Sequence, residues 1–185
     1  MAARYGLPPA QLEPLKPWFV ALTLAVLPLQ QAGHDPNAGA DMRLRAAAVA
    51  DGDAIRGLES FAEQFALLDA LPEALQIDML VQTVEDDGEA LARMERAAAA
   101  WARGDLQTID AELLHELRTG SPALYEAMLT RRNAAWAERI ATLLQGAGTH
   151  LVAVGAGHLI GAGSVQDHLQ QRGIASRRLA PEDEP

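Results

Sequence analysis

A short apolar run that leads into a glycine-rich turn constrains this chain more than any other feature. Leu151-Val152-Ala153-Val154 runs directly into Gly155-Ala156-Gly157-His158, and residues 164–172 then predict a short helix. A bounded apolar run of this length is typical of a buried strand. In α/β folds, functional side chains gather where a strand ends and a helix begins. The stretch therefore predicts a strand, a turn and a helix, with His158 as the candidate functional residue.

Most of the remaining sequence favours helix. Apolar residues make up 49% of the chain but aromatic residues only 4%, so alanine and leucine dominate. Ser60 and Glu63 have the spacing of a capping box at a helix start. We expect helices over residues 18–31, 41–50, 73–84, 89–103, 106–118 and 123–144. Two further short strands are expected over residues 54–59 and 175–179.

These elements predict a helix-dominated α/β fold, with a small mixed or parallel sheet and a large helical insertion. We expect one domain over residues 1–185, with a mainly helical body at 60–148. A strand-turn-helix-strand unit would follow at 149–180. Because so thin a sheet has unpaired edges, a homo-oligomer could form through its exposed edge.

Charge and cysteine content exclude several classes of function. The net charge of −10 argues against a nucleic-acid partner, since a phosphate binder needs a basic face. The absence of cysteine excludes disulfides, thiolate nucleophiles and cysteine-based metal sites. The apolar run from Trp18 to Leu29 is shorter than the roughly 20 residues that span a bilayer, so no membrane span is expected. The region before this run holds Glu13 and several prolines, which does not fit a signal peptide, and the compartment stays unassigned.

The residues around His158 leave its role open between metal ligand, general base and helix cap. His150 lies at the other end of the same predicted strand, on the order of 25 Å away, so the two histidines cannot share one ion. The sequence has neither a Gly-x-Ser-x-Gly elbow nor a Walker lysine. Glu59 ends the predicted strand 54–59 and is the carboxylate at a comparable strand end. It is either a functional group or a surface carboxylate that the helix dipole favours.

The segment from Val152 to Leu159 resembles the C-terminal motif of the TraB/GumN family, which is related to the Tiki proteins. Further segments resemble family segments in the same order along residues 17–179. These are Pro17-Trp18, Gly39-Ala40-Asp41, Gly57-Leu58-Glu59-Ser60, Trp101-Ala102-Arg103-Gly104-Asp105 and Arg132-Asn133.

The resemblance implies a metal-dependent hydrolase, which in Tiki proteins is a protease, acting on a peptide or small-molecule substrate. It implies that His158, at the family's second Gly-x-x-His motif, and Glu59 bind a divalent metal ion. Arg132 would match the arginine of the Arg-Asn motif and hold a carboxylate or an oxyanion. Catalytic roles are thus expected for Glu59, Arg132 and His158. Members of this family are often exported or associated with the cell envelope.

The sequence departs from the family pattern at its start. The family's first Gly-x-x-His motif lies upstream of the Pro-Trp segment, whereas residues 155–158 form the one Gly-x-x-His in this chain. We therefore expect a truncated member with an incomplete active site. The alternative is a non-catalytic helical domain for binding or interaction, or a fragment of a larger family member.

Overall fold

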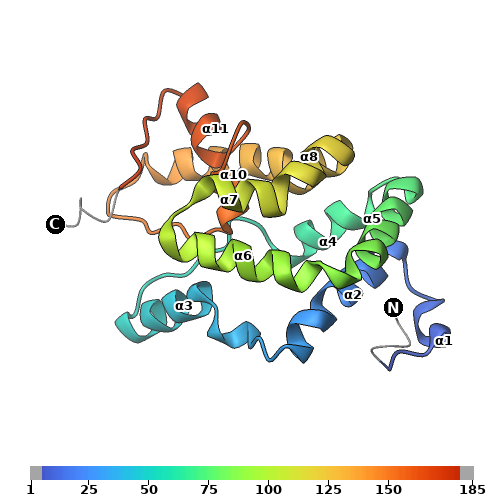
Figure 1. Cartoon of the computed structure of the whole chain (residues 1–185). Helices are drawn as coiled ribbons and strands as arrows, with labels where there is room; N and C mark the ends of the chain where they lie inside the picture. The colour runs from blue at the N-terminus through green and yellow to red at the C-terminus, as the bar shows by residue number, and fades with distance from the viewer. Residues whose placement is uncertain (1–5, 180–185) are drawn as a thin grey trace. The chain divides into compact units, whose positions relative to one another are not determined.

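The computed structural model describes residues 6–179, and helices dominate this part of the chain (Figure 1). The chain divides into two compact units, residues 1–116 and 117–185. The boundary falls inside helix α8 (His115–Gly120). Each unit has its own helix pairs, so each is considered by itself.

The first unit is built from helices that begin and end where their sequence signals lie. Ser60 accepts from the Glu63 N–H while the Glu63 carboxylate accepts from the Ser60 N–H, which completes the expected capping box of α4. The elements of this unit before α8 are α1 (Pro9–Leu12), α2 (Pro17–Gln31), η2 (Pro36–Ala38), α3 (Ala40–Asp51), α4 (Phe61–Asp69), α5 (Glu73–Glu85), η3 (Asp86–Gly88), α6 (Ala90–Arg103), α7 (Leu106–Ile109) and η4 (Asp110–Leu114).

The first unit's core gathers around Trp18 at the start of α2, which packs along α5. The Trp18 ring meets Phe65 edge-to-face, with 5.4 Å between ring centroids. Its indole N–H donates to Asp69 Oδ1 at 3.2 Å, so the polar end of this buried ring has a partner. Lys16 also binds Asp69, and these two hydrogen bonds hold the pKa of the Asp69 carboxyl below its ordinary range.

Helix α6 and the helix that starts with α7 and continues as η4 lie against each other. Gly104 ends α6 in the left-handed conformation (φ 68°), and Asp105 caps α7 by accepting from the Thr108 N–H. η4 is a π-helical turn, in which the His115 N–H bonds to the Asp110 carbonyl five residues back. Arg96 of α6 donates twice to the Glu112 carboxylate of η4, at 2.7 and 2.8 Å.

The second unit contains one long helix and one short helix that pack together. The long helix consists of α9 (Pro122–Tyr125), the π-helical turn η5 (Glu126–Thr130) and α10 (Arg131–Leu143). The short helix α11 (Val165–Gln171) packs on α10, and a 3-10 turn, η6 (Ala156–Leu159), precedes it. Trp136, Ala137 and Ile140 of α10 are buried, as are Val165 and Leu169 of α11.

The predicted sheet is wrong. Among the described residues no strand forms, and the segments 54–59 and 150–155 and the residues of 175–179 are irregular instead. Leu151 is 80% exposed and Leu179 is 61% exposed, so these apolar runs are not buried as sheet strands would be. A strand forms only beside a neighbour that completes its hydrogen-bond ladder. An apolar run by itself is therefore not sufficient to make a strand. The expected homo-oligomer was to form through a sheet edge, and the described residues contain no sheet.

The predicted helices agree closely with the observed ones. The helix expected over residues 18–31 is α2, and the helix expected over 123–144 is the long helix from Pro122 to Leu143. The sequence signals did not reveal the two π-helical turns. Across residues 6–179, no helix is both long enough and apolar enough to cross a membrane.

Candidate functional site

His158 lies in η6, the turn that the glycine-rich sequence makes before α11. The His158 N–H bonds back to the Gly155 carbonyl at 2.9 Å, which closes the turn. The next residue but one, Ile160, is 6% exposed and anchors the end of the turn in the unit's interior. The imidazole ring is half-buried. The turn thus presents this one ring toward α10 at a fixed position.

Arg132 and Asn133 begin α10 directly after the π-helical turn η5. In that turn the Arg131 N–H bonds to the Glu126 carbonyl five residues back. A π-helical turn adds a residue to the helix and shifts the angular position of everything that follows. Asn133 comes to lie 2% exposed, while Arg132 stays half-buried beside it.

The structure brings Arg132 and His158 together. Arg132 Nη1 lies 3.5 Å from His158 Nε2 and also donates to the Met128 carbonyl at 3.0 Å. On the other side of the ring, His158 Nδ1 lies 2.6 Å from Asn133 Oδ1. Both nitrogens of the ring therefore face a side chain from α10.

Trp136, one turn further along α10, forms the floor of this group. Its ring centroid lies 4.4 Å from that of His158, and the Arg132 guanidinium carbon lies 4.7 Å from the Trp136 ring centroid. Trp136 is 6% exposed, so this floor is buried. We call the four residues Arg132, Asn133, Trp136 and His158 the histidine cluster.

The third residue implied by the resemblance, Glu59, belongs to the first unit. It is half-buried and directly precedes Ser60, the N-cap of α4. The turn before it needs glycine, since a Cβ at Gly57 would lie 2.6 Å from the Glu59 carbonyl oxygen. The local backbone geometry therefore explains why the Gly-Leu-Glu segment begins with glycine.

The histidine cluster alone does not make a metal site. Metal ions in proteins take three or more nitrogen, oxygen or sulfur ligands from side chains such as His, Asp and Glu. Of the four residues in the cluster, His158 alone is of this kind. No group of three or more such residues is suited to an ion within the described part of the chain. A neutral imidazole fits one ligand position, and any further ligands have to come from outside the cluster.

The cluster combines three chemical capacities in one place. The imidazole can accept or donate a proton, or bind a cation through a free lone pair. The guanidinium beside it can hold a carboxylate or a developing oxyanion. The buried amide of Asn133 can fix the ring's orientation. Sequence reasoning missed Asn133 as a site residue, although its place next to Arg132 in the Arg-Asn pair was the available signal.

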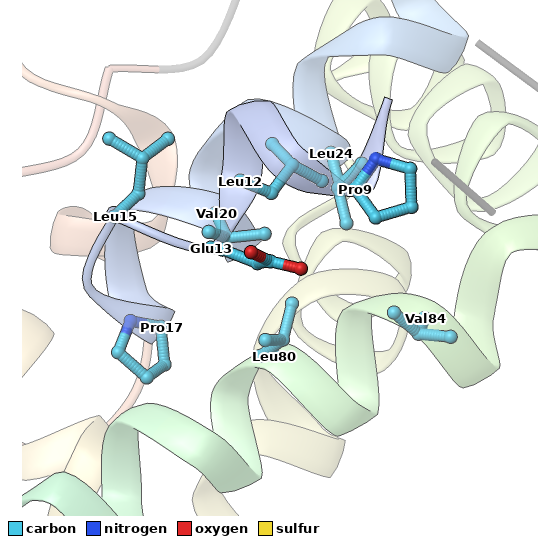
Figure 2. Close-up of a pocket in the computed structure, with 9 residues that line it drawn as sticks. All are labelled: Pro9, Leu12, Glu13, Leu15, Pro17, Val20, Leu24, Leu80 and Val84. Carbon is cyan, nitrogen blue, oxygen red and sulfur yellow. The ribbon is translucent and has the colours of Figure 1, made fainter. Parts of the chain in front are cut away.

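The first unit also holds an apolar hollow of about 420 Å³, bounded by α1, α2 and α5 (Figure 2). Figure 2 shows the Glu13 carboxylate among its apolar side chains. The hollow is lined by Pro9, Leu12, Glu13, Leu15, Pro17, Val20, Leu24, Leu80 and Val84. It contains none of the residues implied by the resemblance, and one exposed carboxylate does not define a chemistry for it.

Comparison with known proteins places these observations in a family. The family described as TraB/PrgY/gumN matches residues 1–178. The protein named "Uncharacterized protein YbaP" from Escherichia coli (strain K12) is 27% identical over 165 residues, which cover 89% of this chain and 60% of that protein. The protein of the same name from Shigella flexneri matches equally. The chain thus spans about 60% of the length of these relatives. No solved structure matches it.

Proposed function

Because this chain belongs to the TraB/PrgY/gumN family, we propose that it contributes part of a metal-dependent, peptidase-like hydrolase centre built around His158 and Arg132. The single observation that carries the proposal is the pairing of these two side chains. They are 26 positions apart in the sequence, yet Arg132 Nη1 lies 3.5 Å from His158 Nε2. Both belong to segments that resemble family motifs.

In this proposal His158 and Arg132 have separate tasks. His158 supplies one nitrogen ligand to a divalent ion, which when bound would polarise a scissile carbonyl or activate water. Arg132 holds the substrate's carboxylate or its developing oxyanion. The remaining ligands come from outside the histidine cluster.

The test is metal-dependent peptide hydrolysis by the full chain. A mixture of fluorogenic peptides is incubated with the protein and Zn²⁺ or Mn²⁺, with and without a chelator. We expect hydrolysis that the chelator abolishes and that His158→Ala lowers by about 100-fold or more, as for loss of a group that takes part in the chemistry. His34→Ala, which changes an exposed histidine of the first unit, is the matched control and should keep the activity.

Two results would contradict the proposal. One is that neither Zn²⁺ nor Mn²⁺ supports hydrolysis that the chelator abolishes. The other is hydrolysis that survives in His158→Ala at the level of the His34→Ala control.

A non-catalytic interaction domain is the second candidate, and a specific observation favours it. Several large apolar side chains are well exposed, among them Leu151 at 80%, Phe61 at 74% and Trp101 at 59%. Exposed apolar side chains mark a binding surface where they form one contiguous patch. If this candidate holds, the chain should self-associate or bind a partner chain equally well in wild type and His158→Ala. Light scattering over a concentration series measures the self-association.

A further inference from the structure

We propose that Asn133 is a positioning residue for His158: its buried amide fixes the proton on Nδ1, so that Nε2, which faces Arg132, carries the lone pair. The role of that lone pair in binding an ion rests on the function proposed above. The position of the proton does not depend on it. The inference concerns only residues of the second unit, which contact one another directly.

The amide of Asn133 has an unambiguous orientation. Its Nδ2 lies 2.8 Å from the Gly163 carbonyl oxygen. A carbonyl oxygen can only accept a hydrogen bond, so the NH₂ end of the amide faces Gly163. The oxygen end therefore faces His158, where Oδ1 and Nδ1 are 2.6 Å apart. An amide oxygen can only accept, so Nδ1 has to carry the proton.

The opposite side of the ring agrees with this assignment. Nε2 faces Arg132 Nη1 at 3.5 Å, and a guanidinium can only donate. A proton on Nε2 would set two donors against each other. With the proton on Nδ1, both the Asn133 oxygen and the Arg132 guanidinium face a complementary ring nitrogen.

Gly163 in turn holds Asn133 in place. The Gly163 N–H donates to Asp167 Oδ2 at 3.0 Å, and the Asp167 N–H donates to the Ser164 hydroxyl at 3.4 Å. Gly163 has a φ of 75°, and a Cβ there would lie 3.2 Å from Thr130 Cγ2. The first turn of α11 thus fixes the carbonyl that orients the amide, and the amide orients the ring.

These contacts resemble those that orient a metal-binding histidine through its second ring nitrogen. Histidines that bind metals through one ring nitrogen donate the other N–H to an oxygen acceptor, which fixes the tautomer. Here the acceptor is Asn133, which is 2% exposed and itself held by a backbone carbonyl. If no metal takes part, the same arrangement keeps Nε2 unprotonated, with its lone pair directed at Arg132.

The experiment is ¹H–¹⁵N NMR of the histidine side chains in the full-length protein, which distinguishes protonated from unprotonated ring nitrogens. At neutral pH we expect His158 to show a protonated Nδ1 and an unprotonated Nε2. The exposed rings of His34 and His150 should instead favour the Nε2–H tautomer that prevails in water. A wild-type His158 with its proton on Nε2 would overturn the proposal without need of any variant.

The variant Asn133→Leu removes the acceptor while keeping a side chain of similar size. We expect His158 to shift toward the tautomer mixture of the exposed histidines. The matched control is Gln76→Leu, which removes another buried amide, one that donates to the Leu71 carbonyl at 2.8 Å in the first unit. It should leave the His158 signals unchanged. An unaltered His158 tautomer in folded Asn133→Leu would overturn the role of Asn133.

Titration with Zn²⁺ separates this inference from the proposed function. If His158 has its proton on Nδ1 but its Nε2 signal does not respond to Zn²⁺, the positioning role stands and the metal-ligand role fails. If Nε2 responds to Zn²⁺ but Asn133→Leu leaves both the tautomer and the Zn²⁺ affinity unchanged, the metal ligand stands and the positioning role fails.

Discussion

The π-helical turns η4 and η5, both within residues 6–179, lie beside polar groups of different kinds. In the first unit, Glu112 of η4 pairs with Arg96 of α6 through two hydrogen bonds at 2.7 and 2.8 Å. In the second unit, η5 is followed by Arg132 and Asn133, which face His158. The first arrangement joins opposite charges near the surface, since the Arg96 side chain is 49% exposed. The second uses a buried neutral amide to order a titratable ring.

An irregular helical turn is a candidate for function only in some surroundings. A surface ion pair gives little net stability and has no group left for chemistry. A buried amide that binds a histidine fixes the direction of a lone pair, which is what a reactive site needs. A π-helical turn therefore points to a site only when the residues that it displaces meet a group able to react. Substitutions on both sides of this comparison test it.

Trp136→Ala should have the largest effect. It removes a ring that is 6% exposed and on which both His158 and Arg132 rest. Truncation of a buried tryptophan costs about 3–5 kcal/mol of unfolding free energy. Urea denaturation followed by circular dichroism measures the loss. Trp101→Ala is the control, because that ring is 59% exposed and its loss should cost far less. An equal loss of unfolding free energy in both variants would mean that Trp136 is not packed beneath the histidine cluster.

Gly163→Ala should have an intermediate effect of about 1–3 kcal/mol, because a non-glycine residue in the left-handed region is strained. The new Cβ would also press on Thr130 Cγ2 at 3.2 Å. Gly173→Ala is the matched control, since its φ is 77° but no atom lies within 4 Å of the added Cβ. The excess cost at Gly163 measures the contact with Thr130, and adding Thr130→Ser should recover it. The absence of any excess in urea denaturation would show that this turn is not tightly held.

Glu112→Gln should have the smallest effect, and one that depends on pH. Its hydrogen bonds from Arg96 hold the pKa of the Glu112 carboxyl below its ordinary value near 4.5. The ion pair's contribution to the free energy of unfolding is therefore complete above the ordinary pKa of the Glu112 carboxyl. It is lost as the pH falls through the lower pKa that this carboxyl has in the folded protein. The stability difference between wild type and Glu112→Gln should accordingly be small at pH 7 and vanish in acid. Thermal denaturation at pH 7 and pH 3 measures it, and a difference that grows in acid would contradict this assignment.

The sequence predicts the helices of this protein well because their signals are local. Ser60 and Glu63 are three residues apart, and their reciprocal bonds form as expected. Gly104 and Asp105 end one helix and start the next for reasons contained in those two residues. The predicted strands failed because a strand depends on a partner. The run from Leu151 to Val154 has the composition of a strand, yet no neighbouring strand accompanies it in the part of the chain that the structure describes.

The candidate site is only partly predictable from the sequence, because local motifs identify single residues but not their distant partners. Arg132 and His158 could be selected from motifs, and they do meet. The role of Asn133 could not be derived, because its partners lie 25 and 30 residues away in a turn whose conformation no local pattern specifies. The phase shift that η5 gives to α10 is likewise invisible in a helical periodicity. Contacts between distant residues determine the geometry of the candidate site, whereas neighbouring residues determine where the helices begin and end.

The hydrogen bond from Gly163 to Asp167 has a consequence for exchange with solvent. An amide proton in a connecting segment ordinarily exchanges with deuterium quickly, because water reaches it without unfolding. The Gly163 N–H donates to the Asp167 carboxylate of the following helix, so its exchange requires this hydrogen bond to break first. When the bond re-forms faster than the amide exchanges, the protection of this one amide measures the free energy of local opening beside the histidine ring.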